Sequence, residues 1–406
     1  MIIVITNRKL PNTPIDQPIT LNVRDLGASL GERAGVEDVI YSGILSSDKN
    51  VIDFYPKGEE ATLFSCLSDS DRAKSWVVFV HGFNQEPLDN IDKARALSAY
   101  HGVNVVAFSW PSKPESHDMG WSDTAKSAAI GVLSGLSGST ILVGLLRQKV
   151  KSFLEDKWRN YEPAIKNAEQ SNIDLIAALK LINKHLAPNK PPVLLVHSMG
   201  NYLLEKTMDN RESLPMKFSN IILHQADADS PDYVWVKKLL VNLDSSLGSQ
   251  AKAYITVNYA DYVLGASSTR RFILNTTAHS KLKTERIGQV RSNHLDCGFV
   301  YLDFSNGKWV DNEHEFFQLP KDKTNDYVYD CLHKILKAKP DDLPELERKS
   351  NAGFTRIPAN KPGIKLYRLE NIIHPADYDD FYIYTSLKEY DASNQPKVHD
   401  DPDMFG

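Results

Sequence analysis

Short apolar segments alternate with amphipathic segments along most of the chain from Trp76 onward. The apolar segments are rich in valine and isoleucine and are bounded by polar or turn residues. They are Val77–Val80, Val103–Phe108, Val193–Val196, Ile221–Leu223, Ala253–Val257 and Phe299–Phe304. Uninterrupted apolar runs of this length are typical of strands that are buried on both faces of a parallel sheet. We predict that these segments form the central strands of one sheet.

The segments between these runs have helical periodicity. Asn90 is a candidate N-cap for a helix that continues to about Tyr100, and Asn172 for a helix with one apolar face. That face consists of Leu175, Leu179, Ile182 and Leu186. Further helices are predicted after Ser198 and over residues 233–243 and 327–336. Strands that alternate with helices predict the α/β class, with a mostly parallel central sheet flanked by helices.

The chain has 406 residues, and its organisation predicts one large domain over residues 1–340. The stretch from Lys113 to Asn172 is too long for a single crossover connection, so we interpret residues 113–172 as a helical insertion that acts as a lid or cap. Residues 341–406 lack clear periodicity and contain scattered proline and aspartate. They are predicted to form a C-terminal extension that is peripheral or partly disordered.

Charge and cysteine content exclude several classes of protein. The formal net charge is −5, which gives no basic surface for nucleic acid. Cys66, Cys297 and Cys331 are far apart in the sequence and form no C-x-x-C pair, so neither a disulfide framework nor a thiolate metal site is expected. The N-terminal MIIVITNRKLP has no basic region ahead of its apolar residues, and it is interpreted as a strand rather than an export signal. A cytoplasmic location is therefore expected.

Cofactor and metal motifs are absent from the sequence. It contains neither G-x-x-x-x-G-K-[ST] nor G-x-G-x-x-G, the phosphate-binding and dinucleotide-binding patterns. The acidic stretch over residues 374–380 matches no zinc or calcium loop spacing. We expect no cofactor and no metal ion.

Polar residues with catalytic chemistry follow the predicted strands. In PPVLLVHSMGNYLL, the apolar run ends at Val196 and is followed by His197 and Ser198. His81-Gly82-Phe83-Asn84 follows one earlier strand and Ser109-Trp110-Pro111 follows the next, while Asp227, Asp261 and His314 follow later strands. The carboxyl ends of parallel strands meet at one edge of a sheet, where loops and helix N-termini converge. These residues are therefore predicted to form one site.

Each of these residues has a role in nucleophilic acyl transfer. Ser198 would be the nucleophile, His314 the general base, and Asp261 the carboxylate that orients the imidazole. The order serine, acid, histidine along the chain is the one found in α/β-hydrolases. Asp227, one strand earlier, is the alternative acid. His279 and His294 are weaker candidates for the base because they precede the last strand.

Other positions complete the predicted site. The backbone N–H groups of Phe83 and Met199 would form an oxyanion hole, and His81 and Trp110 are candidates for the wall of a substrate pocket. His197 is interpreted as a packing or orienting residue. Val196 occupies the position where a G-x-S-x-G turn has glycine, and we expect a strained turn that still supports catalysis.

Four signatures carry a resemblance to a known family. They are T-N-R (Thr6–Arg8), F-V-H-G-F-N (Phe79–Asn84), F-S-W-P-S (Phe108–Ser112) and H-S-M-G-N (His197–Asn201). In this order, over Met1 to Leu319, they resemble a bacterial α/β-hydrolase family of uncharacterised esterase/lipase superfamily enzymes. The resemblance implies the α/β-hydrolase fold and a serine nucleophile. The chain departs from the family pattern at Ala226, Ala260 and Glu313, next to its acids and its histidine.

The stretch Ser127 to Leu146 contains no charged residue and includes Gly131 and Gly135 in a G-x-x-x-G spacing. A lid or buried helix accounts for this stretch, and peripheral membrane contact through residues 127–146 stays open. Either favours a lipophilic acyl substrate. The sequence thus predicts a serine hydrolase that acts on a small-molecule or lipid-like ester, with thioesters and amides left open. The alternatives are a hydrolase-like binding module whose catalysis has decayed, and a membrane-acting lipase or toxin.

Overall fold

The computed structural model describes residues 1–112 with short breaks between residues 13 and 49, and residues 140–258 with breaks at 187, 189 and 229–233. It also describes shorter stretches between residues 261 and 338, and residues 354–357 and 365–369. The strands are β1 (Ile2–Thr6), β2 (Ile19–Asn22), β3 (Tyr41–Leu45), β4 (Val51–Tyr55), β5 (Trp76–Val80), β6 (Asn104–Ser109), β7 (Val193–His197), β8 (Asn220–His224), β9 (Lys252–Val257), β10 (Phe299–Asp303), β11 (Phe354–Ile357) and β12 (Lys365–Leu369).

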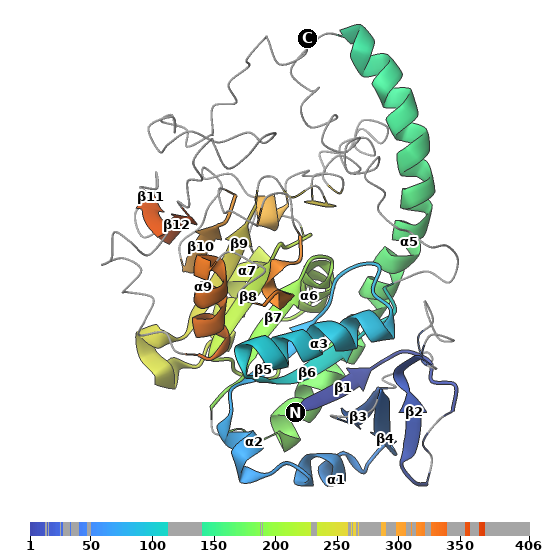
Figure 1. Ribbon diagram of the computed structural model, residues 1–406, viewed down its shortest axis with the longest axis vertical. Coiled ribbons are helices and arrows are strands. Elements are labelled where there is room, and N and C mark those ends of the chain that lie inside the picture. The colour runs from blue at the N-terminus through green and yellow to red at the C-terminus, as the bar shows by residue number, and fades with distance from the viewer. Residues whose placement is uncertain are drawn as a thin grey trace.

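These strands form a single 12-stranded sheet in the order β11-β12-β10-β9-β8-β7-β5-β6-β1-β3-β4-β2 (Figure 1). Neighbouring strands from β12 through to β1 run parallel. At the edges, β3, β4 and β2 pair antiparallel beyond β1, and β11 pairs antiparallel with β12. The predicted central strands are all present, with ends displaced by at most one residue, so the predicted α/β class with a mostly parallel sheet is confirmed.

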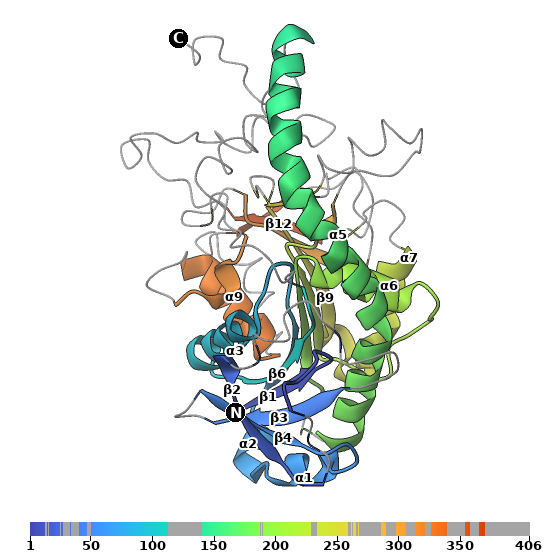
Figure 2. The ribbon, with the colours of Figure 1, turned by 90° about the vertical axis from the view of Figure 1, so that its right-hand side faces the viewer.

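Helices cover both faces of the sheet. The α-helices are α1 (Glu60–Ser65), α2 (Asp69–Ala73), α3 (Pro87–His101), α5 (Thr140–His185), α6 (Gly200–Met208), α7 (Val234–Leu239) and α9 (Asp326–Leu336). Short 3₁₀ turns are η3 (Leu240–Asn242), η4 (Ser245–Gln250), η5 (Ile287–Gln289) and η7 (Phe316–Gln318). Figure 2 shows α3 and α9 on one side of the sheet and α5 and α6 on the other.

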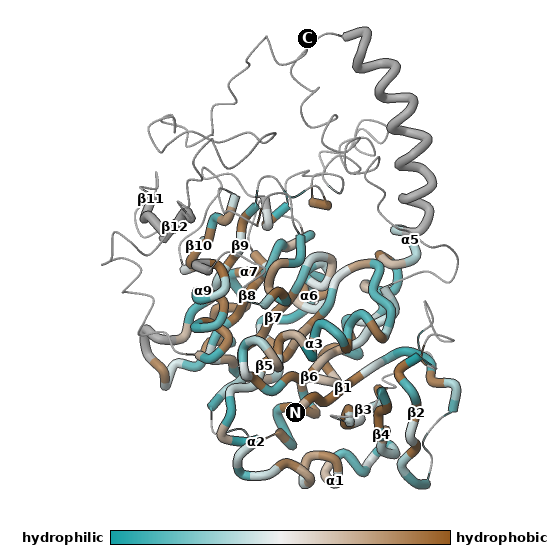
Figure 3. The backbone as a smooth tube through the Cα atoms, viewed as in Figure 1, coloured by the Kyte–Doolittle hydropathy of each residue, from teal (hydrophilic) through white to brown (hydrophobic). Residues whose placement is uncertain are grey.

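The sequence of β5 shows why the strands are continuously apolar. Val78 and Val80 belong to the buried cluster on the α5 and α6 face, whereas Val77 and Phe79 belong to the cluster on the α3 and α9 face. Because successive side chains point to opposite faces, a strand covered on both sides must be apolar at every position. Figure 3 shows the resulting concentration of hydrophobic residues in the central strands.

Two predicted helix starts were wrong. Helix α3 begins at Pro87 after the N-cap Glu86, and Asn90 lies inside it, fully buried. Proline presets a helical φ in a first turn, which explains the earlier start. Helix α5 continues through Asn172 toward the N-terminus. Its buried face extends there through Ala164, Ala168 and Ser171, whose small side chains give little hydrophobic signal in the sequence.

The remaining parts of the predicted organisation overlap the described residues only in part. Residues 113–139 of the predicted insertion, including most of the uncharged stretch 127–146, lie outside the described residues. Strands β11 and β12 come from the segment beyond residue 340, and β12 pairs with β10. Among the helices that the structure describes, none has the length and apolar character needed to cross a membrane.

Candidate active site

Ser198 lies on the turn between β7 and α6, in a left-handed conformation with φ of 51°. This conformation is uncommon for a residue with a side chain and is strained, so the surrounding structure must hold it. The Ser198 N–H donates to the carbonyl of His224 (3.0 Å), and the Ser198 carbonyl accepts from the N–H groups of Asn201 (3.0 Å) and Asp227 (3.1 Å). The side-chain amide of Asn201 also donates to the carbonyls of Val196 (3.0 Å) and Ser198 (3.1 Å). These bonds fix the turn from both sides.

Two glycines let the loop after β5 approach this turn closely. A Cβ atom on Gly82 would lie 2.6 Å from Cβ of Ser198, and one on Gly200 would lie 2.7 Å from the carbonyl oxygen of His81. Neither distance is sterically acceptable, so glycine is required at both positions. Val196 is fully buried in the core on the α5 and α6 face. The close contact expected at position 196 is therefore made at positions 82 and 200.

Asp261 follows β9, and His314 follows β10 and precedes η7. The structure brings their side chains together, with 2.5 Å between Nδ1 of His314 and Oδ2 of Asp261. The other carboxylate oxygen of Asp261 accepts from the backbone N–H groups of Val263 (2.9 Å) and Leu264 (3.1 Å). Asp261 is fully buried and His314 is 7% exposed. Among the described residues no group bonds Nε2 of His314, so this nitrogen is left for another partner.

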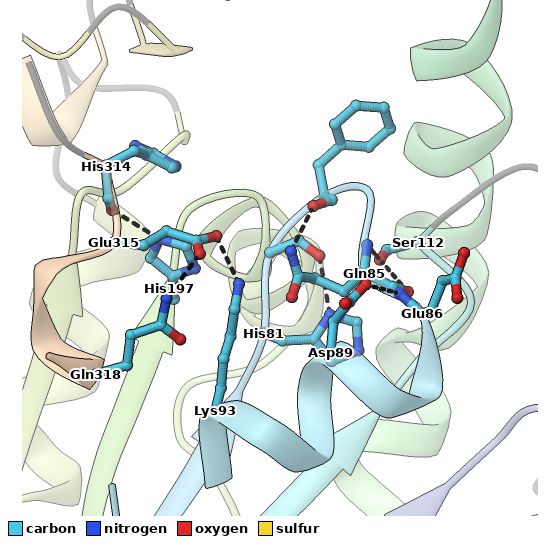
Figure 4. Close-up of polar contacts among 12 residues, drawn as sticks. His81, Gln85, Glu86, Asp89, Lys93, Ser112, His197, His314, Glu315 and Gln318 are labelled. Carbon is cyan, nitrogen blue, oxygen red and sulfur yellow. Dashed lines mark hydrogen bonds and ion pairs between the residues drawn. The ribbon is translucent and has the colours of Figure 1, made fainter. Parts of the chain in front are cut away.

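The loop that carries His314 is attached to the nucleophile turn. Nε2 of His197, the residue before Ser198, lies 3.0 Å from the carbonyl oxygen of His314. Burial, and then the positive charge that His314 can carry, lower the pKa of His197 well below 6.5, so His197 is a neutral donor in this contact. Figure 4 shows the contact between His197 and His314 near a second contact that holds the same loop. In this ion pair, Nζ of Lys93 on α3 lies 2.6 Å from Oε1 of Glu315.

The environment shifts the pKa values of the buried pair. Burial lowers the pKa of His314, but the charge and the hydrogen bond of Asp261 together outweigh burial, and the pKa lies above 6.5. Burial raises the pKa of Asp261, while the charge of His314 and the three hydrogen bonds to the carboxylate oppose this rise. With Nδ1–H donated to Asp261, neutral His314 carries its lone pair on Nε2. This is the form of histidine that can accept a proton.

Asp227, the alternative acid, lies after β8 and has other partners. Its carboxylate is paired with Nε of Arg286 (2.8 Å) and accepts hydrogen bonds from Ser267 (2.7 Å) and Tyr161 (2.5 Å). Asp227 and Arg286 are each 2% exposed. Of the two candidate carboxylates, Asp261 is thus the one that contacts His314.

The predicted oxyanion donors face no competing acceptor in the described part of the chain. Neither the N–H of Phe83 nor that of Met199 makes a hydrogen bond there. Phe83 follows Gly82, which lies against Ser198, and Met199 follows Ser198 directly. Two N–H groups that flank a serine in this way can stabilise negative charge on a bound oxygen.

His81 and Trp110 are both fully buried and bond each other. The backbone N–H of Trp110 donates to Nε2 of His81 (3.0 Å), the indole N–H donates to the His81 carbonyl (2.9 Å), and the rings stack with centroids 5.5 Å apart. Burial first, and then the charge of Arg8, lower the pKa of His81 well below 6.5, which keeps it neutral. These contacts join the loops after β5 and β6. Neither side chain exposes surface to a pocket.

Several residues that hold the site were not identified from the sequence. They are Arg8 and Asn7 after β1, Tyr161 on α5, Lys93 with Glu315, and Arg286, the partner of Asp227. Their partners are distant in the sequence, and only the T-N-R signature drew attention to any of them. Within the described residues no group of three or more His, Cys, Asp or Glu side chains could hold a metal ion.

Comparison with known proteins links the chain to a protein family. No curated protein and no solved structure matches the chain. A family model described as "Alpha/beta hydrolase of unknown function (DUF900)" matches residues 57–316, a range that includes Ser198, Asp261 and His314. The match covers more than half of the 406 residues, and the chain therefore belongs to this family of α/β-hydrolases.

Proposed function

We propose that the protein is a metal-independent serine hydrolase that cleaves a carboxylic ester through an acyl-enzyme on Ser198. The observation that carries the proposal is the 2.5 Å contact between Asp261 and His314, which leaves Nε2 of the imidazole unpaired within the described residues, on a loop that His197 ties to the Ser198 turn. Membership of the α/β-hydrolase family supports hydrolysis as the reaction class.

The proposed reaction has two half-reactions. The hydroxyl oxygen of Ser198 attacks the ester carbonyl while Nε2 of His314 takes the serine proton, and Asp261 stabilises the imidazolium. The N–H groups of Phe83 and Met199 hold the oxyanion of the tetrahedral intermediate. His314 then gives its proton to the departing alcohol. In the second half-reaction a water molecule, deprotonated by His314, releases the acid and restores Ser198.

A lipophilic acyl group is the proposed substrate class. The support is the uncharged stretch 127–146. Residues 127–139 precede α5 in the sequence, and residues 140–146 belong to its first turns. Aromatic packing at Phe83 is consistent with this, since the ring of Tyr161 on α5 packs edge-on against the ring of Phe83 with centroids 5.0 Å apart.

Covalent labelling tests the proposal. A fluorophosphonate probe should modify wild-type protein at Ser198, and Ser198→Ala should remain unmodified. Competition with acyl esters of increasing chain length should protect Ser198 best with the longer chains. If wild type and Ser198→Ala are equally unreactive while both are folded, the enzyme proposal is refuted and a binding module remains. If short-chain esters compete best, the lipophilic substrate class is wrong.

A further inference from the structure

The T-N-R signature begins at the last residue of β1, and its side chains bond three segments around the candidate site: the end of β6, the loop before α3, and α5. The Thr6 hydroxyl donates to the carbonyl of Ser109, the last residue of β6 (2.7 Å). The Asn7 amide donates to Ser171 (2.8 Å) and Asp174 (2.7 Å) on α5. Arg8 donates through Nε to the Ser109 hydroxyl (3.0 Å) and through Nη2 to the Gln85 carbonyl (2.9 Å).

Arg8 is unusual because it is a buried cation that has no ion-pair partner within the described part of the chain. It is 1% exposed, and among the described residues no carboxylate lies within ion-pair distance of it. Its Nη1 is buried and makes no hydrogen bond there. Burial lowers the pKa of Arg8 to about 9, and the charges of Asp89 and Glu86 at the start of α3 oppose this shift, so the guanidinium is protonated at neutral pH. Burying such a charge opposes folding.

The loop that Arg8 holds is the one with the proposed oxyanion donor. We call residues 81–86 the oxyanion loop. It contains no strand or helix, and Asn84 within it has a positive φ of 57°. Two of its backbone N–H groups are bonded by Ser112, whose carbonyl accepts from the Asn84 N–H (3.1 Å) and whose hydroxyl accepts from the Gln85 N–H (3.1 Å). Figure 4 shows Gln85 and Ser112 side by side at the start of α3. Arg8 adds the bond to the Gln85 carbonyl.

We propose that Arg8 is a positioning residue that sets the oxyanion loop against Ser198, so that the Phe83 N–H points at the reacting oxygen. Arg8 lies two residues after β1, which is fixed in the sheet, and it bonds the loop after β5 and the last residue of β6 at the same time. Asn7 fixes α5 to the same strand end, and Asn167 of α5 bonds the Pro111 carbonyl (2.9 Å), which leaves the β6 loop held from two sides. This inference rests on the proposed serine hydrolase function.

The test measures how fast Ser198 is modified by a saturating neutral fluorophosphonate. Arg8→Ala should lower the maximal rate of modification about 10- to 100-fold per folded molecule, because a small displacement of an oxyanion donor costs a rate factor of that size. The probe concentration for half-maximal rate should change little. Guanidinium ion, at concentrations well below those that unfold proteins, should restore part of the rate by filling the space left by the side chain. Sodium chloride at the same ionic strength should not.

Two further variants distinguish a loss of positioning from a general loss of folding. Ser109→Ala removes one oxygen that Arg8 bonds and no charge, so it should fold and show a smaller loss of rate in the same direction. Asn242→Ala is the matched control for lost buried hydrogen bonds. Asn242 is 1% exposed and bonds the Leu214 and Met216 backbone near the start of β8, at the opposite end of the sheet from Ser198. It should be destabilised and keep the wild-type rate per folded molecule.

The outcomes separate the two proposals. If wild type is not modified at Ser198, the hydrolase function fails and the role of Arg8 fails with it. If wild type is modified but Arg8→Ala and Ser109→Ala react at its rate, or slow no more than Asn242→Ala, the role of Arg8 alone is refuted. The same conclusion follows if guanidinium and sodium chloride give equal rates with Arg8→Ala.

Discussion

Replacing Asp261 with asparagine tests the geometry of the candidate site most directly. Asparagine is nearly isosteric, and its carbonyl oxygen can still accept the Val263 and Leu264 N–H groups that now bond Oδ1 of Asp261. Its amide would then face Nδ1 of His314, where the carboxylate oxygen lies 2.5 Å away in the native protein. An amide donates where the carboxylate accepted. His314 would respond by moving its proton to Nε2, the nitrogen that must accept the serine proton.

The expected loss follows from that change of tautomer. A wrong tautomer in a Ser-His-Asp triad lowers the rate by about 10⁴-fold, so we expect Ser198 modification in Asp261→Asn to slow by roughly that factor. The pH profile should also move. In wild type the rate should fall as pH drops below the raised pKa of His314, at a midpoint above 6.5. Without the Asp261 charge, burial dominates, and the midpoint in the variant should lie below 6.5.

Stability and activity should respond to pH with opposite signs. Because the pKa of His314 is higher in the folded protein than the unfolded value of 6.5, proton binding favours the folded state. This stabilisation is fully present below pH 6.5 and is lost as pH rises through the folded-state pKa, which is the same window in which the rate of modification rises. Thermal unfolding across this window should show the effect in wild type and not in Asp261→Asn.

Asp303→Asn is the matched control for this experiment. Asp303 is also a buried carboxylate, 1% exposed, and it accepts from Ser305 at the end of β10 without contacting His314. Its variant should keep the wild-type pH midpoint. A rate for Asp261→Asn within tenfold of wild type, or an unchanged pH midpoint, would show that Asp261 does not orient the base and that the reasoning from this contact is wrong.

Three further predictions follow from the packing around the site. Glu315→Gln leaves the Lys93 ammonium buried without the carboxylate that pairs with it. Because Glu315 is partly exposed, we expect only a moderate decrease in the free energy of unfolding, about 1–3 kcal/mol in urea titrations. Adding Lys93→Met to this variant should recover part of the lost stability. Val196→Ala should cost about 1–2 kcal/mol of stability and retain Ser198 modification, and complete loss of modification would contradict our description of the turn. Asp227→Asn removes the carboxylate charge that pairs with Nε of buried Arg286 and should cost about 3 kcal/mol in the same titrations, yet its folded fraction should be modified far faster than Asp261→Asn.

The central strands and the edge of the sheet where polar residues meet could be predicted because both depend on local patterns. A strand covered on both faces must be apolar throughout, so β5, β7 and β8 are visible as uninterrupted runs. The edge strands were not predicted, because they are short and alternate between buried and partly exposed positions, as β4 does. A four- or five-residue alternation of this kind also occurs in loops and short helices.

The contacts that hold the site depend on distances in space that no local pattern encodes. Arg8 meets Gln85 and Ser109, Tyr161 meets Asp227, and Lys93 meets Glu315, each across a long separation in the sequence. Whether Asp261 or Asp227 contacts His314 also depends on positions in space. Both follow a strand, and only the position of the His314 loop relative to β9 decides which carboxylate contacts the imidazole.

Val196 shows how a motif can mislead when it is used as a list of positions. The glycines of a nucleophile turn are required wherever another backbone passes within contact distance of the turn, because a Cβ atom there would overlap it. In this protein the overlapping positions are Gly82, against Ser198, and Gly200, against the His81 carbonyl. Position 196 faces the core, where valine fills space that glycine would leave empty. The physical requirement is a close approach between the oxyanion loop and the serine, and a glycine on the loop meets it as well as a glycine before the serine.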